Sequence, residues 1–179
     1  DECHRDVRAV HGNEYIVVNG GWHDAGDLCQ GVMNTGEAVY AKLEGYDAVK
    51  NESYAGQWLR ALEEEARWGI EGVLKTRFPD GYRITWSRLG MWTDGVIGTN
   101  DDIVNEADCN HFALYTAAAA EARAARFFAD CDPDFAYRCR GTAKADWETV
   151  QRVPQAVSRR KMSDVEIAAA AVIASCELA

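Results

Sequence analysis

Residues 20–27 form the octet Gly20-Gly21-Trp22-His23-Asp24-Ala25-Gly26-Asp27. Two carboxylates, Asp24 and Asp27, stand three residues apart in this glycine-rich stretch. Such a turn can aim both acids into one cleft, because glycine tolerates positive φ and adds no side-chain bulk. An aspartate near its ordinary pKa of about 4 is ionised at neutral pH and can act as a base. The octet therefore indicates a site where two acids hold and activate a water molecule.

The neighbours of the two acids support this interpretation. Trp22 offers a flat apolar face of the kind on which sugar rings stack, and His23 can bond a sugar hydroxyl. The alternative is that Asp24 and Asp27 only form the turn or cap the next helix.

An extended segment and two helices are predicted around the octet. The β-branched run at residues 15–18 predicts an extended segment that ends in the turn. Asn34, followed three residues later by Glu37, is a capping-box pattern and predicts a helix over residues 34–49. Apolar residues at four-residue spacing predict an amphipathic helix over residues 54–77. These apolar residues are Trp58, Leu62, Ala66, Ile70 and Leu74.

The helical period disappears over residues 78–107, where a turn begins at Pro79. An irregular stretch of about thirty residues inside a compact domain suggests a functional loop. Three aromatic residues of this stretch are candidate sugar platforms: Tyr82, Trp86 and Trp92. Packing beneath the loop is the alternative for each of them.

Three more helices are predicted in the second half. Asp108 or Asn110 can cap an alanine-rich helix that runs to about residue 128. Asp132, followed by proline, opens a helix to about residue 152, and Ser163 opens a second capping box. Five helices joined by alternating short and long connections favour an all-α array of paired antiparallel helices. The last helix has no stop signal at the final residue, so we expect the chain to continue.

Composition excludes several classes of function. The chain has 179 residues, 47% of them hydrophobic, and a net charge of -10, which predicts one folded domain. This charge repels phosphate backbones and anionic lipid surfaces, so we expect neither a nucleic-acid partner nor a membrane partner. No stretch approaches the roughly 20 apolar residues of a membrane span. We expect a secreted or periplasmic protein whose export signal has already been removed.

The six cysteines form no Cys-x-x-Cys pair, which argues against a zinc ribbon or a thioredoxin-like motif. Most are expected to be ordinary thiols, and a disulfide or two stays open if the protein is exported. The four histidines lack metal-ligand spacing, so no metal site is assigned.

The octet closely matches the signature of glycoside hydrolase family 9, Gly-Gly-Trp-(Tyr/His)-Asp-Ala-Gly-Asp. Three further stretches resemble motifs of that family: Arg67-Trp68-Gly69-Ile70-Glu71-Gly72-Val73-Leu74-Lys75, Cys131-Asp132-Pro133-Asp134-Phe135-Ala136 and Asp164-Val165-Glu166-Ile167-Ala168-Ala169-Ala170. The resemblance covers residues from about 15 to the end. It implies an all-α fold of paired antiparallel helices, about half of an (α/α)6 barrel, with a long irregular loop. Residues 1–179 would then be a partial catalytic domain whose carboxyl-terminal half is absent.

The resemblance also assigns roles. Asp27 would be the general base that deprotonates the attacking water, and Asp24 would help to position that water. In inverting enzymes the base and a separate acid stand roughly 6.5–9.5 Å apart, so these two aspartates are not the acid–base pair. The family's acid is a glutamate near the carboxyl end of a longer domain, in a region that this chain lacks. Asn105-Glu106 looks superficially similar, but its position does not match and no role is transferred.

The expected function is therefore inverting hydrolysis of β-glycosidic bonds, most readily in a β-1,4-glucan such as cellulose. The alternative is a non-catalytic carbohydrate-binding or scaffolding fragment that lacks the general acid. A helical-repeat protein that binds other proteins ranks last, because it leaves the octet unexplained.

No cofactor is required for this chemistry. Calcium suits the acidic loop around Asp94, Asp101 and Asp102, although there is no EF-hand pattern and a solvated acidic loop is the alternative. The expected partners are a β-linked glycan and a second polypeptide segment that completes the barrel.

Overall fold

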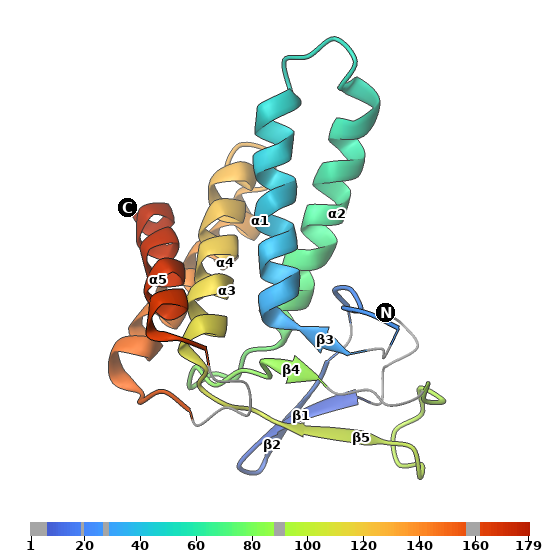
Figure 1. The fold of residues 1–179 in the computed structure, drawn as a ribbon. Helices are drawn as coiled ribbons and strands as arrows, with labels where there is room; N and C mark the ends of the chain where they lie inside the picture. Colours follow the sequence, from blue (N-terminus) through green and yellow to red (C-terminus); the bar gives the residue numbers. More distant parts are fainter. Residues whose placement is uncertain (1–6, 19, 27–28, 88–91, 157–161) are drawn as a thin grey trace.

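The computed structural model describes residues 7–18, 20–26, 29–87, 92–156 and 162–179. These residues are mostly helical, which confirms the predicted all-α class (Figure 1). The helices are α1 (Val32–Val49), α2 (Gly56–Lys75), α3 (His111–Phe128), α4 (Pro133–Arg152) and α5 (Asp164–Leu178). The short strands are β1 (Val7–His11), β2 (Glu14–Val17), β3 (Gln30–Gly31), β4 (Trp86–Ser87) and β5 (Ile103–Glu106).

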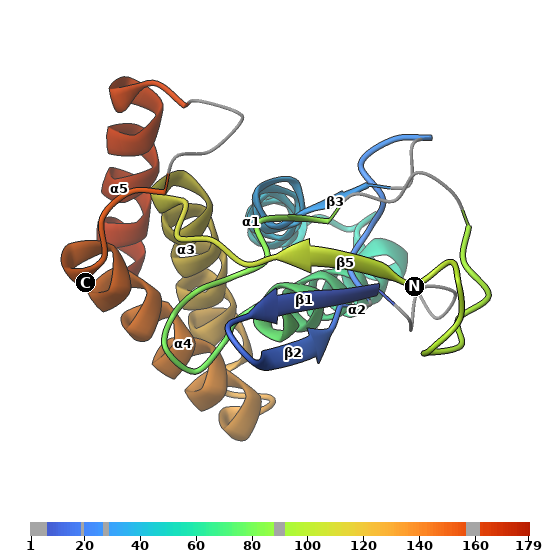
Figure 2. The same ribbon diagram turned by 90° about the horizontal axis from the view of Figure 1, so that it is seen from below.

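The helices form two layers. One layer consists of α1, α3 and α5, and α3 packs against both of the others. The second layer consists of α2, which packs on α1, and α4, which packs on α3. Consecutive helices run antiparallel, and the strands lie together at one end of the helices (Figures 1 and 2). This arrangement of paired helices is consistent with part of an (α/α)6 barrel.

The main core lies between the two layers. It is built from Val39 and Leu43 of α1, Ile70 of α2, and Phe128 and Phe135 of the α3–α4 pair, all buried. Most of the α3 alanines are also buried, and their small size lets α1, α4 and α5 approach α3 closely.

The buried stripe of α2 differs from the predicted one. It consists of Ala66, Gly69, Ile70, Gly72 and Val73. Trp58, which the four-residue pattern placed on the apolar face, is 58% exposed. The buried stripe follows a three-and-four spacing, which keeps it on one side of the helix over several turns.

The start of α1 also differs from the prediction. The helix begins at Val32, with Gly31 as the residue before it and without a side-chain cap. Asn34 and Glu37 are exposed within the helix, so the predicted capping box does not form. The reason is tertiary: the amide of Val32 donates to the carbonyl of Thr85 at 3.1 Å, so a neighbouring segment binds this free helix end.

The starts of α3, α4 and α5 were predicted correctly, whereas α2 begins at Gly56, two residues after the predicted start. The Asn110 side chain accepts a hydrogen bond from the amide of Ala113 at 3.2 Å. Of the two candidate caps of α3, Asn110 is therefore the one that forms. Asp132 accepts from the corresponding amide of α4 at 3.1 Å. At α5, Ser163 accepts from the amide of Glu166, and the Glu166 carboxylate accepts from the Ser163 amide, which completes the capping box.

The short strands form two small sheets. β1 lies between β2, which is antiparallel to it, and β5, which is parallel to it, while β3 and β4 form a separate antiparallel pair. The extended segment expected at residues 15–18 is largely β2. Pairing with β5 ties the end of the long irregular stretch to the beginning of the chain.

Arg83 anchors the irregular stretch to the helices. Its side chain is fully buried, and its Nη2 donates to Glu121 of α3 and to Asp146 of α4, each at 2.5 Å. Its backbone forms a pair of hydrogen bonds with Asp108. Asp146 also accepts from Arg77 at 2.8 Å, so the carboxylate lies between two guanidinium groups. This network joins residues 77–87 to the α3–α4 pair.

Within the described ranges, no helix has the length and apolar character needed to cross a membrane. Cys109 and Cys139 are buried free thiols, and burial raises the pKa of each, to about 11 and about 12 respectively.

Candidate active site

The octet lies against the backbone of α2. Gly20 and Gly21 have φ values of 98° and 71°, a region that residues with a side chain rarely adopt. A Cβ on Gly72 of α2 would lie 2.6 Å from the Gly21 nitrogen. The turn can lie this close to the helix because Gly72 has no side chain, and glycines at positions 20 and 21 allow the positive φ values of the turn.

Trp22 packs into the groove between α1 and α2. A Cβ on Gly69 would lie 2.3 Å from the indole Cη2, and the indole Nε1 donates to Glu65 at 3.2 Å. The ammonium of Lys42 lies 4.1 Å from the centre of the ring. These contacts give Trp22 a packing role, and its role in stacking against a sugar stays a prediction.

Asp24 is half-buried and held at the amino-terminal end of α1. Its amide donates to the carbonyl of Cys29 at 2.8 Å. Its Oδ1 accepts from the amide of Gly31 at 3.3 Å. A carboxylate is favoured at this position because the amino-terminal end of a helix carries partial positive charge.

Trp86 completes the surroundings of Asp24. The two strands pair Gly31 with Trp86, and a Cβ on Gly31 would lie 2.7 Å from the indole Cζ3 and 3.3 Å from Asp24 Oδ2. The structure therefore brings together two predicted site residues, Asp24 and Trp86, on either side of a glycine. Gly31 was not predicted as a site residue. A glycine immediately before a helix, a few residues after an acid, was the signal that could have found it.

Asp27, the predicted general base, lies outside the described residues, so its role stays a prediction. The two described ends of its loop, Asp24 and Cys29, are joined by the backbone hydrogen bond given above.

The remaining predicted residues fall into two places. His23 and Trp92 contact each other edge to face, with ring centres 5.6 Å apart, and Trp92 is 57% exposed. Tyr82 instead stacks on His11, with ring centres 4.1 Å apart, and His11 in turn pairs with Asp80 at 2.7 Å. The structure thus brings Trp92 to the octet, whereas Tyr82 belongs to a second aromatic cluster.

The acidic loop binds mainly its own backbone. Asp101 accepts from the amide of Asp94 at 2.7 Å, and Asp102 accepts from the amide of Gly98 at 2.9 Å. The hydroxyl of Thr99 donates to Asp101 at 2.6 Å and lowers the pKa of that carboxyl. In the described part of the chain, no group of three or more His, Cys, Asp or Glu residues is arranged to hold a metal ion. Calcium binding stays a prediction.

Comparison with known proteins gives a consistent result. The family model described as "Glycosyl hydrolase family 9" matches residues 1–174. Endoglucanase D of Acetivibrio thermocellus is 26% identical over 148 residues, which cover 75% of this chain and 23% of that protein. A cellulose 1,4-beta-cellobiosidase of Acetivibrio thermocellus is 27% identical over 167 residues, which cover 76% of this chain and 18% of that protein.

The fold is also similar to solved structures. A single mutant of a thermostable endoglucanase from Alicyclobacillus acidocaldarius matches with a TM-score of 0.75 at 22% identity. The match covers 98% of this chain and 37% of that chain. The chain therefore spans less than a quarter of the length of these two curated relatives, and somewhat over a third of the solved structure.

Proposed function

The chain belongs to glycosyl hydrolase family 9, and from this premise we propose that it is part of an enzyme that hydrolyses β-glycosidic bonds in a cellulose-type glucan. The names of the curated relatives, an endoglucanase and a cellulose 1,4-beta-cellobiosidase, support the substrate class. The single observation that carries the proposal is the Asp24 carboxylate, held by the Gly31 amide beside the Trp86 ring.

In the proposed mechanism Asp27 takes a proton from a water molecule that Asp24 orients. The Gly31 amide holds one oxygen of Asp24, which restricts the directions in which the carboxylate can bind that water. The water then attacks the anomeric carbon and the configuration inverts. Inversion needs a proton donor on the opposite face of the sugar, roughly 6.5–9.5 Å from the base. We assign that donor to the part of the protein that this chain does not include.

Aromatic residues would bind the sugar. Trp92 is the strongest candidate, because more than half of its side chain is exposed and it contacts His23 of the octet. Trp86 is the second candidate, because its ring lies beside Asp24. Trp22 and Tyr82 are weaker candidates, because their rings contact other side chains of the fold.

A second segment would complete the barrel. A groove of about 420 Å³ lies between α1, α3 and α5, on the side away from α2 and α4. It is lined by Tyr40, Phe112 and Ile173, among other residues. Val165 and Val172 of α5 are 77% and 60% exposed. Apolar helix faces of this kind are normally covered, and we assign the cover to the remaining helices of the barrel.

The test uses the longest natural polypeptide that contains this chain, with release of reducing ends from cello-oligosaccharides as the measurement. The Asp27→Ala variant should lose at least about 10²-fold in kcat, because general-base catalysis is removed, and should still bind the oligosaccharide. The Asp24→Asn variant should also lose kcat, since its amide keeps an acceptor for Gly31 but loses the charge. Asp130→Ala, at an exposed carboxylate beyond the end of α3, is the matched control. Near-normal turnover of the Asp27→Ala variant would contradict the proposal.

A second candidate function is a carbohydrate-binding fragment without catalysis. It is favoured by one observation, the small share of the curated relatives' length that this chain spans. The chain alone would release no reducing ends under either candidate, so the longest natural polypeptide that contains it distinguishes the two. If that polypeptide binds oligosaccharides but releases no reducing ends, the second candidate would be favoured.

A further inference from the structure

Two buried polar groups lie on the short β3–β4 pair. The Nε2 of Gln30 and the Oγ of Ser87 are buried, and neither has a hydrogen-bond partner in the part of the chain that the structure describes. Ser87 is only 2% exposed. Buried polar groups in folded proteins are almost always bonded to protein or to ordered water. Each of these two groups therefore needs a partner that the described residues do not supply.

The two groups belong to one cross-strand pair. Gln30 and Ser87 are directly opposite each other in the antiparallel β3–β4 pair. Side chains of such a pair project from the same face of the sheet, about 4.5–5.5 Å apart at Cβ. One small ligand between them can therefore reach both.

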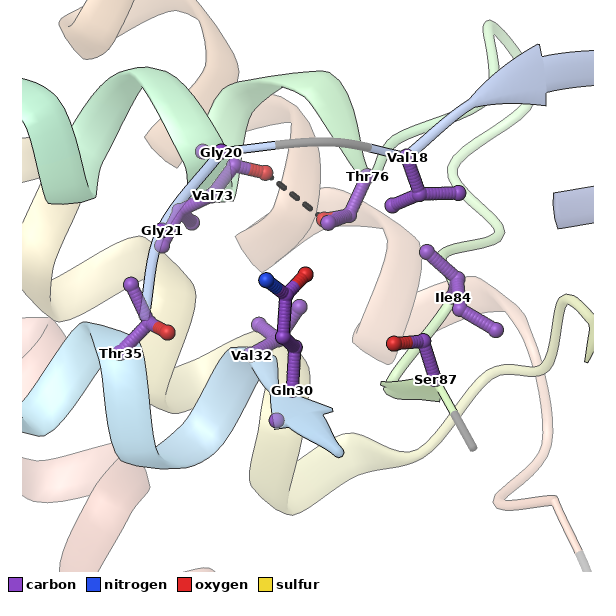
Figure 3. Close-up of a pocket in the computed structure, with 12 residues that line it drawn as sticks. Val18, Gly20, Gly21, Gln30, Val32, Thr35, Val73, Thr76, Ile84 and Ser87 are labelled. Atoms are coloured by element: carbon purple, nitrogen blue, oxygen red, sulfur yellow. Dashed lines mark hydrogen bonds between the residues drawn. The ribbon is translucent and has the colours of Figure 1, made fainter. Parts of the chain in front are cut away.

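A cavity of suitable size lies in front of this pair. Its volume is about 20 Å³, and Gln30 and Ser87 both extend toward it (Figure 3). A cavity needs roughly 10–15 Å³ to hold one water molecule, and a bound water needs two to four polar partners. The rest of the wall is mostly apolar and comes from Val18, Val32, Val73 and Ile84, among others. A volume of this size suits one water molecule.

The hydroxyl of Thr76, one of two threonines that line the cavity, is already engaged. Thr76 Oγ1 donates to the carbonyl of Val73 at 2.7 Å and accepts from Arg83 at 2.9 Å. It therefore has no donor hydrogen left for Gln30 or Ser87.

We propose that this cavity binds one ordered water molecule, which accepts a hydrogen bond from Gln30 Nε2 and donates one to Ser87 Oγ. The water gives each group one hydrogen-bond partner and joins β3 to β4. The adjacent pair in the same two strands is Gly31 and Trp86, which flank Asp24. The water therefore holds in register the two strands that position the Asp24 carboxylate. This inference stands on the geometry of the cavity and does not depend on the proposed activity.

The sign of a stability change tests the proposal. If the water is bound, Ser87→Ala and Gln30→Met each break a satisfied network. Each should then lower Tm by about 2–4 °C, as expected for a loss of about one buried hydrogen bond in a chain of this size. The double variant should cost less than the sum of the two, because it leaves no unpaired group. If the cavity is dry, each single substitution removes an unsatisfied group and should raise Tm or leave it unchanged, which would overturn the proposal.

The control is Ser175→Ala, whose exposed hydroxyl donates to the carbonyl of Val172 at 2.8 Å. It measures the effect of removing a serine hydroxyl away from the cavity, and its Tm change is subtracted from that of Ser87→Ala.

A high-resolution crystal structure gives the direct observation. A water peak should lie about 2.7–3.2 Å from both Gln30 Nε2 and Ser87 Oγ. The same peak should be absent from the Ser87→Ala/Gln30→Met double variant. An empty cavity in the unsubstituted protein, or a direct hydrogen bond between Gln30 and Ser87, would overturn the proposal.

Discussion

Gly72 of α2 lies against Gly21 of the octet so closely that a Cβ on Gly72 would be 2.6 Å from the Gly21 nitrogen and 2.9 Å from its Cα. Both neighbouring atoms belong to the backbone, so no side-chain rotation can relieve the overlap. The position of the octet relative to α2 therefore depends on the absence of one side chain in the helix.

The Gly72→Ala variant should be destabilised, because the turn must move away from α2 to admit the methyl group. Overpacking of this kind costs typically about 1–3 kcal/mol, although alanine has the higher helix propensity. Urea unfolding followed by circular dichroism measures the change.

Gly141→Ala in α4 is the control for this prediction, because nothing lies within 4 Å of a Cβ at that position. It should stabilise the protein by about 0.5–1 kcal/mol, through helix propensity alone. Equal changes in the free energy of unfolding for the two substitutions would show that the contact between the turn and α2 does not limit the size of residue 72.

The Arg83→Met variant should lose about 3–5 kcal/mol of stability, because it removes one of the cationic partners of the buried Asp146 and leaves the buried Glu121 carboxyl without its hydrogen-bond donor. Asp146 keeps only Arg77, and Glu121 loses its donor. The free energy of unfolding in guanidinium chloride is the measurement. Arg60→Met removes an ion pair with Glu64 that is largely exposed, and should leave stability unchanged within error.

The buried glutamate predicts a pH dependence. Burial raises the pKa of Glu121 well above its ordinary value of 4.5, and the charge of Arg83 only partly opposes the shift. The folded protein then holds a proton that the unfolded chain releases above about pH 4.5. This contribution to stability is fully present below pH 4.5 and is lost as the pH rises toward the raised value.

The Glu121→Gln variant should therefore flatten the fall in stability between acid and neutral pH, while its amide oxygen still accepts from Arg83. Unfolding curves at a series of pH values from 4 upward, for both proteins, check the slope. A variant with the same slope as the unsubstituted protein would place the titrating group elsewhere.

The lowered pKa of Asp132 should make stability depend on pH with a sign opposite to that of Glu121. The hydrogen bond from Arg67, at 2.6 Å, lowers the pKa of Asp132, and the amide at the start of α4 adds to the shift. Its contribution is present above the ordinary value of 3.8 and is lost as the pH falls through the lowered value.

Asp132→Asn keeps an acceptor for the α4 amide but loses the ion pair, so it should remove this acid-side dependence at a small loss of stability. Asp132→Ala also removes the cap and should lose more. Thermal unfolding between pH 2 and 5 compares the two. Equal stabilities of the Asn and Ala variants would show that the cap contributes nothing.

Features that depend on a few neighbouring residues were predicted from the sequence. The caps Asn110, Asp132 and Ser163 are examples, because each bond joins a side chain to an amide three residues away. The fold class followed from patterns of the same local kind, while the role of Asp24 stays a prediction. The start of α1 was misplaced at Asn34, because the first helical amide, that of Val32, donates to Thr85, some fifty residues away in sequence.

Features that depend on distant partners were decided by the tertiary structure. Asp24 lies beside Trp86 only because β3 pairs with β4, and Tyr82 lies apart because it stacks on His11. Arg83 meets its carboxylates 38 and 63 residues along the chain. A local pattern fixes which backbone groups can bond within one turn. Only packing decides which distant side chains share a buried volume, because that choice minimises the free energy of the whole fold.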